Sequence, residues 1–185
     1  MTTLRRAAKV AGLLTLATLS AGCRDDSLEA IKRKVRADFP EVRQMSVEDL
    51  RADLLRGDVP LLLDVRRPEE YAVSHLPGAL RVDPGDPNPA LPPGTPRNAP
   101  IVVYCSVGYR SSKLARTLQE GGYSNVANLE GSIFEWAAEG HPMVRTEDGT
   151  VVTAHRVHPY SRAWAWLVPE ELRSFAAEAG GGEGQ

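Results

Sequence analysis

The sequence predicts an α/β protein built on a parallel β-sheet. Short apolar segments alternate with amphipathic segments through the middle of the chain, and this alternation is typical of βαβ units. The run LLLDV at 61–65 is almost continuously apolar, as expected of a strand that is buried on both faces of such a sheet. A chain of 185 residues is long enough for one domain with a single sizeable core.

The first part of the chain, 1–22, has the features of a secretory signal peptide. Arg5, Arg6 and Lys9 precede an apolar run over 10–19, and small residues follow, as at a cleavage site. The apolar run has about half of the roughly 20 residues that a membrane-spanning helix needs. A buried N-terminal helix is the alternative interpretation.

The residue after this segment is Cys23, preceded by Ser20, Ala21 and Gly22. This arrangement resembles the lipobox of bacterial lipoproteins, which implies cleavage before Cys23 and acylation of its sulfur. The protein is therefore expected to be exported and lipid-anchored to the cell membrane, facing the periplasm or the cell exterior. Plain secretion with a free Cys23 is the alternative. With Cys23 acylated, Cys105 has no disulfide partner in the chain, so its thiol is expected to be kept for its reactivity.

Two helices are predicted before the sheet. The first lies within 23–39, after the lipidated N-terminus, and is expected to dock on the domain. Its apolar residues share one helical face, and they are Leu28, Ile31, Val35 and Phe39. Ser46 is a suitable N-cap for a second helix over 47–56, which Gly57 ends.

The remaining elements follow from local composition. Strands are predicted at 61–65, 79–82, 101–104 and 126–129, and helices from Pro68, over 111–120 and over 132–139. The segment 83–100 holds seven prolines in eighteen positions, which excludes regular structure and predicts a stiff surface loop. The glycine-rich segment 180–185 is expected to be a flexible tail.

The residues of greatest chemical interest follow the strand at 101–104. Cys105 stands where this strand ends, a short loop containing Gly108 follows, and Arg110 closes the loop at the start of a helix. Unpaired amides and the macrodipole at a helix start stabilise a thiolate. Successive loop amides form a nest for an anion, and Arg110 adds a permanent positive charge. The pattern predicts an activated sulfur nucleophile; a buried structural thiol is the alternative.

Three segments in this order resemble the rhodanese-like sulfurtransferases: LLDVRRPEEYAVSHLPGALRV at 62–82, YCSVGYRSSKLA at 104–115 and NLEGSIFEWAAEGHPMV at 128–144. The resemblance covers roughly 40–145 and implies a five-stranded parallel sheet with helices on both faces. To this domain the sequence adds the N-terminal docking helix and a C-terminal extension over 146–179.

The resemblance also implies an activity. Cys105 would take a sulfane sulfur from a small donor, thiosulfate or a persulfide, and pass it as a persulfide to a thiol or cyanide-like acceptor, without a cofactor. The loop would bind the substrate and stabilise the persulfide through Ser106, Val107, Gly108, Tyr109, Arg110 and Ser111. Asp64 and Arg66 would support this loop, or would form a structural ion pair. His75 is expected to be structural.

The same residues are compatible with other functions. Four residues separate Cys105 from Arg110, whereas related phosphatases and arsenate reductases use a loop one residue longer, so phosphatase or arsenate reductase activity is the weaker alternative. A sulfur carrier that does not turn over, or a redox-sensing module, would need the same loop of backbone amides around the cysteine. Arg110 is the one basic residue of the loop, so thiosulfate is expected to be a poor donor. The net charge of −2 gives no sign of nucleic-acid binding.

The segment 157–175, the C-terminal arm, lies beyond the resemblance. Tyr160, Trp164 and Trp166 are expected to pack on the core as a cover; a surface for a protein partner or a rim for the substrate is the alternative. His155 and His158 lack carboxylate or cysteine companions nearby in the sequence, so no metal site is predicted.

Overall fold

The computed structural model describes residues 25–83, 85–86 and 89–176. The predicted signal peptide (1–22), the predicted lipidation site Cys23 and the predicted tail (180–185) lie outside the described residues. Within the described ranges, no helix is both long enough and apolar enough to cross a membrane.

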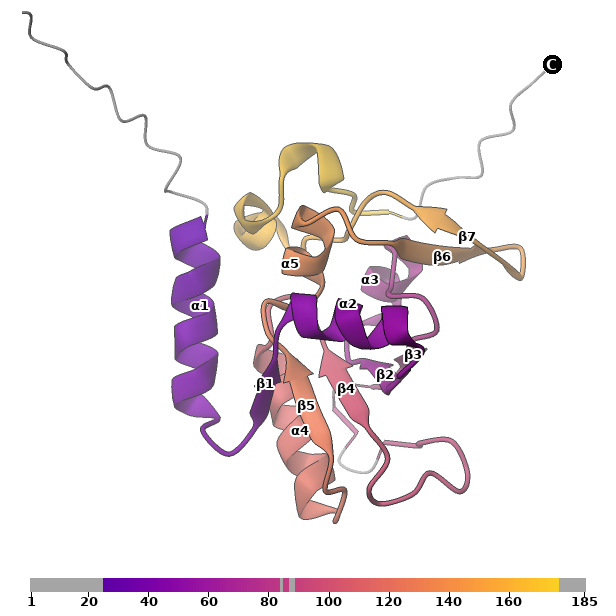
Figure 1. The fold of residues 1–185 in the computed structure, drawn as a ribbon. Helices are drawn as coiled ribbons and strands as arrows, with labels where there is room; N and C mark the ends of the chain where they lie inside the picture. The colour runs from indigo at the N-terminus through magenta and orange to yellow at the C-terminus, as the bar shows by residue number, and fades with distance from the viewer. Residues whose placement is uncertain (1–24, 84, 87–88, 177–185) are drawn as a thin grey trace, which may run out of the picture.

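A five-stranded parallel sheet forms the centre of the molecule, which confirms the predicted fold class (Figure 1). Its strands are β1 (Arg43–Met45), β2 (Leu61–Asp64), β3 (Leu80–Arg81), β4 (Ile101–Tyr104) and β5 (Val126–Leu129). Their order in the sheet is β1-β5-β4-β2-β3. β4 is therefore the central strand, and the residue after it emerges between the carboxyl ends of two neighbouring strands.

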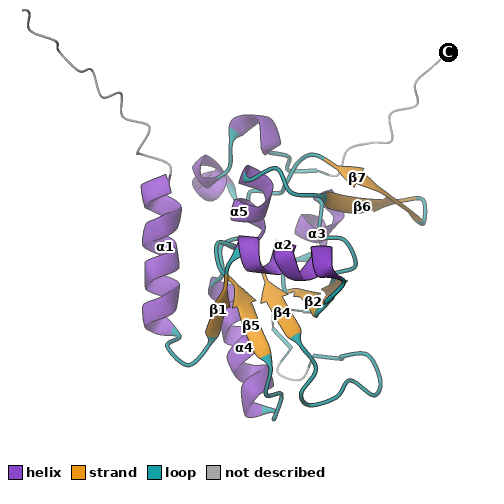
Figure 2. Ribbon diagram, in the orientation of Figure 1, coloured by secondary structure: helices purple, strands orange, loops and turns teal. Residues whose placement is uncertain are grey.

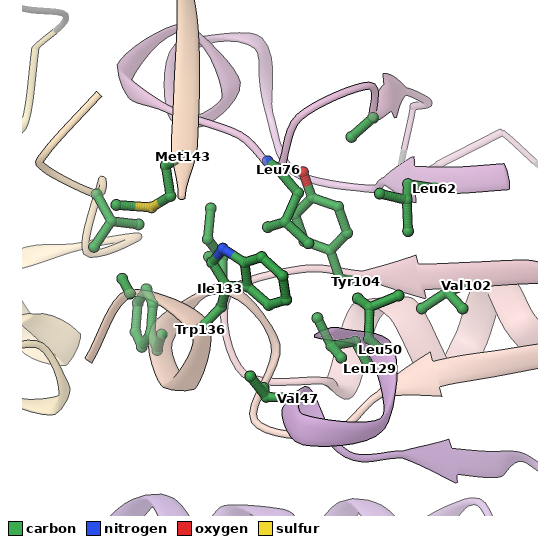
Figure 3. Close-up of a cluster of buried hydrophobic side chains, with 14 of the residues drawn as sticks. Val47, Leu50, Leu62, Leu76, Val102, Tyr104, Leu129, Ile133, Trp136 and Met143 are labelled. Carbon is green, nitrogen blue, oxygen red and sulfur yellow. Dashed lines mark hydrogen bonds between the residues drawn. The ribbon is translucent and has the colours of Figure 1, made fainter. Parts of the chain in front are cut away.

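Helices cover both faces of the sheet, because the side chains of the central strands alternate between two buried clusters. Val102 and Tyr104 join one cluster with residues of α2 (Val47–Arg56) and α5 (Ser132–Ala138). Val103 joins the other, with residues of α1 (Asp25–Asp38) and α4 (Tyr109–Glu120). Figure 3 shows the first cluster, in which labelled side chains of α2, β4 and α5 meet. A short helix, α3 (Pro68–Val73), connects β2 to the turn before β3.

The residues predicted to start and end α2 occupy its two ends. Ser46 Oγ accepts a hydrogen bond from the backbone N–H of Asp49 at 3.0 Å, and Gly57 ends α2 with a φ of 83°. A side chain at that φ is disfavoured, so glycine suits the position. α1 begins at Asp25, and Val35 on its apolar face is buried, as is Phe39 directly after its last residue.

The chain after α5 contains structure that the sequence patterns did not reveal. β6 (Met143–Glu147) and β7 (Thr150–Ala154) form an antiparallel hairpin. Two 3₁₀ helices follow in the C-terminal arm, η1 (Arg162–Leu167) and η2 (Glu170–Leu172). The arm, yellow in Figure 1, lies beyond the carboxyl ends of the sheet strands.

The loop that connects β3 to β4 lies toward the opposite end of the sheet (Figure 2). Its described residues between 83 and 100 form turns without helix or strand, as predicted from its prolines. The two ends of the sheet are therefore different in character. In Figure 1, α5, the hairpin and the arm lie at the end of the sheet that carries Cys105, whereas loops lie at the other end.

Candidate active site

Cys105 occupies the first position after β4, and 1% of its surface is exposed. Its Sγ accepts a hydrogen bond from the backbone N–H of Gly108 at 3.2 Å. Its own N–H donates to Ser132 Oγ at 3.2 Å, and its carbonyl accepts from the N–H of Ile133 at 3.3 Å. The backbone of the nucleophile candidate is thus held by the β5–α5 connection, while its sulfur faces the loop amides.

Gly108 gives the loop its shape. Its φ is 103°, and a Cβ at this position would lie 3.1 Å from Asn128 Nδ2, so both conformation and space favour glycine. The Gly108 carbonyl accepts hydrogen bonds from the N–H and the Oγ of Ser112 at 3.1 and 2.8 Å, in the first turn of α4. Ser111 Oγ donates to Asn128 Oδ1 at 2.6 Å and fastens this turn to β5. The predicted loop residues are therefore brought together around the sulfur.

Arg110 is held by Glu70, a residue that the sequence analysis did not single out as functional. The guanidinium donates two hydrogen bonds to the Glu70 carboxylate, at 2.9 and 2.8 Å, and a third to Ser106 Oγ at 3.0 Å. Ser106 Oγ in turn donates to Glu70 at 3.1 Å. Glu70 is fully buried in α3. The sequence indicated only that a short helix after β2 would lie at the same end of the sheet as Arg110; it did not indicate which acidic residue of that helix would pair with Arg110.

The ionisation of these groups follows from their contacts. Burial opposes the charge on Glu70, but hydrogen bonds and charge from Arg110, with further bonds from Arg67, outweigh burial and lower its pKa to about 2. Burial also works against a thiolate at Cys105. The positive charge of Arg110 and hydrogen bonds from Ser111 and Val107 overcome that effect and lower the Cys105 pKa. The thiolate form of Cys105 is thereby favoured.

Asp64 and Arg66 form a fully buried ion pair with an Nη2–Oδ2 distance of 2.7 Å. The Arg66 guanidinium also donates to the carbonyl of Ser74 and lies 5.9 Å from the ring centre of Tyr104. These contacts fit the structural ion pair of the sequence analysis, because they tie the end of β2 to the turn after α3. In the described part of the chain, the Arg110 guanidinium donates its hydrogen bonds to Glu70 and Ser106 instead.

His75 belongs to this same turn. Its ring stacks on Tyr71 with 3.8 Å between ring centres, and its backbone pairs with Val144 of β6. Both contacts are structural, as expected from the sequence. Among the described residues, no cluster of three or more His, Cys, Asp or Glu side chains is arranged to hold a metal ion.

The aromatic residues of the C-terminal arm do not form the predicted cover over the core. Tyr160 and Trp164 are each 37% exposed and Trp166 is 48% exposed. The arm is anchored by its smaller apolar residues Val157, Leu167 and Val168, which are buried. The prediction of packed aromatic residues was wrong because aliphatic side chains of the same segment fill that space.

Two of the arm's aromatic residues instead line a cavity above Cys105. The cavity has a volume of about 190 Å³. Its lining consists of loop residues and arm residues, namely Cys105, Ser106, Val107, Tyr109, Arg110, Tyr160 and Trp164. The structure therefore corresponds to the alternative of a rim around the candidate site.

Tyr160 is fixed at this position by polar contacts. Its φ of 66° is unusual for a residue with a side chain. Its N–H donates to Nδ1 of the buried His158 at 3.1 Å, and its carbonyl accepts from Arg67 at 3.0 Å. The Cζ atom of Arg110 lies 4.9 Å from the centre of its ring, a distance at which a cation and an aromatic face attract. The arm and the loop thus meet through Arg110 and Tyr160.

Comparison with known proteins identifies the family. Residues 46–139 match the rhodanese-like domain. A sulfurtransferase of Allochromatium vinosum is 35% identical over 106 residues, which cover 57% of this chain and 98% of that protein. The thiosulfate:glutathione sulfurtransferase of Saccharomyces cerevisiae is 29% identical over 113 residues, which cover 54% of this chain and 81% of the yeast protein.

A solved structure shares the fold. It is a Rhodopseudomonas palustris protein of unknown function described as a possible tyrosine phosphatase, with a TM-score of 0.51 and 23% identity over 70% of this chain and 98% of that one. The chain belongs to the rhodanese-like domain family. Its relatives include proteins named sulfurtransferases, and this kinship supports a function in sulfur transfer of the rhodanese type.

Proposed function

We propose that this protein is a sulfurtransferase that carries a sulfane sulfur as a persulfide on Cys105. The main support for the proposal is the position of Cys105 Sγ, which accepts a hydrogen bond from the backbone N–H of Gly108 at 3.2 Å. The loop around this sulfur is closed by Arg110, which donates to Ser106 Oγ. The thiolate is favoured there because the Cys105 pKa is lowered, by the charge of Arg110 and by hydrogen bonds that outweigh burial. A thiolate is the reactive form of cysteine toward sulfur.

The proposed reaction consists of two displacements at sulfur. The Cys105 thiolate attacks the outer sulfur of the donor, an S–S bond forms, and the donor's own bond to that sulfur breaks with its electron pair on the leaving group. An acceptor thiolate or cyanide then attacks the outer sulfur of the Cys105 persulfide, and the electron pair of the broken S–S bond returns to Sγ. The loop amides compensate the negative charge in the persulfide, as in an oxyanion hole.

The intact mass of the protein tests this proposal. The protein is incubated with thiosulfate or a small persulfide, and we expect a gain of one sulfur atom that cyanide removes. Cys105→Ser should show no gain. Wild-type protein that gains no sulfur from any donor, or a gain that persists in Cys105→Ser, would contradict the proposal.

A second candidate is a sulfur carrier or redox sensor that does not turn over. The observation in its favour is the enclosure of Cys105, which is 1% exposed beneath the arm, since an enclosed persulfide is protected from stray thiols. Steady-state release of thiocyanate separates the two candidates. Many turnovers per protein would support the enzyme, whereas one loading without repeated release would support the carrier.

Phosphatase or arsenate reductase chemistry is less well supported. Such reactions need positive charge directed at a tetrahedral oxyanion. Here the guanidinium of Arg110 already donates two hydrogen bonds to Glu70 and one to Ser106. Hydrolysis of p-nitrophenyl phosphate by the wild-type protein, lost in Cys105→Ser, would favour this alternative.

We also propose that the protein is exported and anchored to the membrane through a lipid on Cys23. The support comes from the sequence: a basic start, a short apolar run and small residues before Cys23. Cell fractionation of wild type and Cys23→Ser tests the proposal. We expect the wild-type protein in the membrane fraction and the variant in the soluble exported fraction; a wild-type protein that remains soluble would exclude the anchor.

A further inference from the structure

The C-terminal arm gives the cavity above Cys105 an aromatic wall. Tyr160 and Trp164 stand edge to face, with ring centres 6.2 Å apart and planes at 89°. Both line the cavity together with Val107 and Tyr109. The walls that a bound molecule meets beside the sulfur are therefore largely carbon. Aromatic rings arranged in this way bind other rings through edge and face contacts.

The charge available to a bound molecule in this cavity is small. Arg110 is the one cationic side chain among the described lining residues, and its guanidinium pairs with the buried carboxylate of Glu70 while the ring of Tyr160 lies against it. Arg67, which also lies against that ring at 5.2 Å, pairs with Glu69 and Glu70. A doubly charged donor would lose its hydration in the cavity without gaining a free counter-charge.

The cavity has the size of a small ring. Its volume of about 190 Å³ exceeds the roughly 150 Å³ of an apolar protein cavity that accepts benzene. A sulfane-sulfur donor with an aromatic or similarly apolar body would place its outer sulfur near Cys105 Sγ and its body against the rings of the arm.

We propose that Tyr160 and Trp164 select donors whose leaving group has an apolar body and carries at most one negative charge, such as organic thiosulfonates and organic persulfides, over thiosulfate. This inference rests on the proposed function. With a thiosulfonate, the Cys105 thiolate attacks the outer sulfur and an S–S bond forms. The bond from that sulfur to the sulfonyl sulfur breaks, and its electron pair leaves with the sulfinate. The charge is the same on both sides, and no further reactant is needed.

The experiment compares three donors on the full chain: thiosulfate, methanethiosulfonate and benzenethiosulfonate, at equal concentration and pH. The rate of sulfur loading on Cys105 is followed by intact mass. We expect benzenethiosulfonate to load fastest and thiosulfate slowest in the wild-type protein. Trp164→Ala should reduce the ratio of the benzene to the methane donor by about threefold to tenfold, the range expected for one aromatic contact. Taking a ratio cancels the intrinsic reactivity of each donor when variants are compared.

A matched control and a second variant complete the design. Trp166 lies on the same helix η1 as Trp164, but its ring is more exposed and does not line the cavity. Trp166→Ala should therefore leave the ratio unchanged. Tyr160→Asn removes the other ring with a residue that tolerates a positive φ, and it should lower the ratio as Trp164→Ala does.

The outcomes distinguish this inference from the proposed function. Thiosulfate loading as fast as benzenethiosulfonate in the wild type, or an unchanged ratio in both ring variants, would overturn the inference and leave the sulfurtransferase intact. Loading by none of the three donors would reject both.

Discussion

Glu70 and Arg110 form a bidentate ion pair, with N–O distances of 2.9 and 2.8 Å, between α3 and the first turn of α4. The carboxylate is fully buried and the guanidinium is partly exposed. The same carboxylate accepts from Ser106 Oγ. One buried acid therefore holds both ends of the loop that follows Cys105.

Replacing Glu70 by Gln should destabilise the protein. Arg110 would lose its counter-charge, and we expect a loss of about 2–3 kcal/mol in the free energy of unfolding, less than the roughly 3–5 kcal/mol of a fully buried pair because Arg110 reaches solvent. Urea unfolding at pH 7 measures the loss. Glu69→Gln is the matched control, because this exposed neighbour makes a surface pair and should cost under about 0.5 kcal/mol. Equal losses in the two variants would contradict this role of Glu70.

The same residue predicts a stability profile in acid. The Glu70 pKa is about 2 in the folded protein, below its ordinary value of 4.5, because bonds from Arg110 outweigh burial. A carboxyl whose pKa falls on folding stabilises the protein above its unfolded pKa, and this stabilisation is lost as the pH falls from about 4.5 toward 2. Melting temperatures across this range should fall less steeply in Glu70→Gln than in wild type. Parallel curves would show that other carboxyls dominate.

Arg110 should control the ionisation of Cys105. In Arg110→Gln, burial is no longer offset by the positive charge, so the Cys105 pKa should rise and the pH at which alkylation reaches half its maximal rate should increase. Arg110→Lys keeps the charge and should shift this midpoint less. Iodoacetamide labelling, measured at Cys105 by peptide mass, reports both midpoints. A midpoint unchanged in Arg110→Gln would assign the lowered pKa to the loop amides alone.

Gly108→Ala should slow sulfur loading and destabilise the fold by about 1–3 kcal/mol, the usual cost of a side chain at a strained backbone position. The added Cβ would also press on Asn128 Nδ2, which lies 3.1 Å away. Gly94→Ala provides the matched control. Gly94 also has a positive φ, 80°, but a Cβ there would meet no atom of the described residues within 4 Å. If both variants loaded sulfur at the wild-type rate, the shape of the Cys105 loop would not limit the reaction.

The attachment of the arm should weaken in mild acid. His158 Nδ1 accepts from the N–H of Tyr160, and burial lowers the His158 pKa below its ordinary value of 6.5. A histidine whose pKa falls on folding stabilises the protein above its unfolded pKa, and the stabilisation declines as the pH drops below about 6.5. Tyrosine and tryptophan fluorescence between pH 7.5 and 5 should report a change that His158→Asn diminishes. Buried His75, whose pKa is also lowered by burial, contributes to the slope that remains in this variant. An identical profile in His158→Asn would place the change elsewhere.

Local sequence patterns predicted most of the sheet and its helices. Apolar runs such as 61–65 and 101–104 are buried on both faces of the sheet, and such runs are readily recognised as buried strands. Ser46 and Gly57 mark the start and the end of α2 where expected. β1 was missed because three residues, Arg43–Met45, are too short to show a period. The hairpin of β6 and β7 was missed although Asp148 and Gly149 form a typical hairpin turn. Its strands are partly exposed and carry weaker apolar signals.

The sequence predicted the part of the candidate site that lies in one continuous segment, but not the residues that other segments contribute. The loop from Cys105 to Ser111 is contiguous, so its residue types and spacing indicate its chemistry directly. Glu70 and Tyr160 reach the loop only through tertiary contacts, and no local pattern fixes such a pairing. The exposure of Trp164 was likewise decided by competition with aliphatic residues of the arm for space on the core.

The hydrogen bonds that hold the backbone of Cys105 have a consequence for protein synthesis. Its N–H and carbonyl are bound by Ser132 and Ile133, which leave the ribosome after it, whereas Glu70 leaves before it. The newly made thiol therefore stays without its backbone partners until the β5–α5 connection has been translated. The site around Cys105 is therefore completed together with the core. In a nascent chain that stalls before residue 132, Cys105 lacks the backbone hydrogen bonds that Ser132 and Ile133 provide.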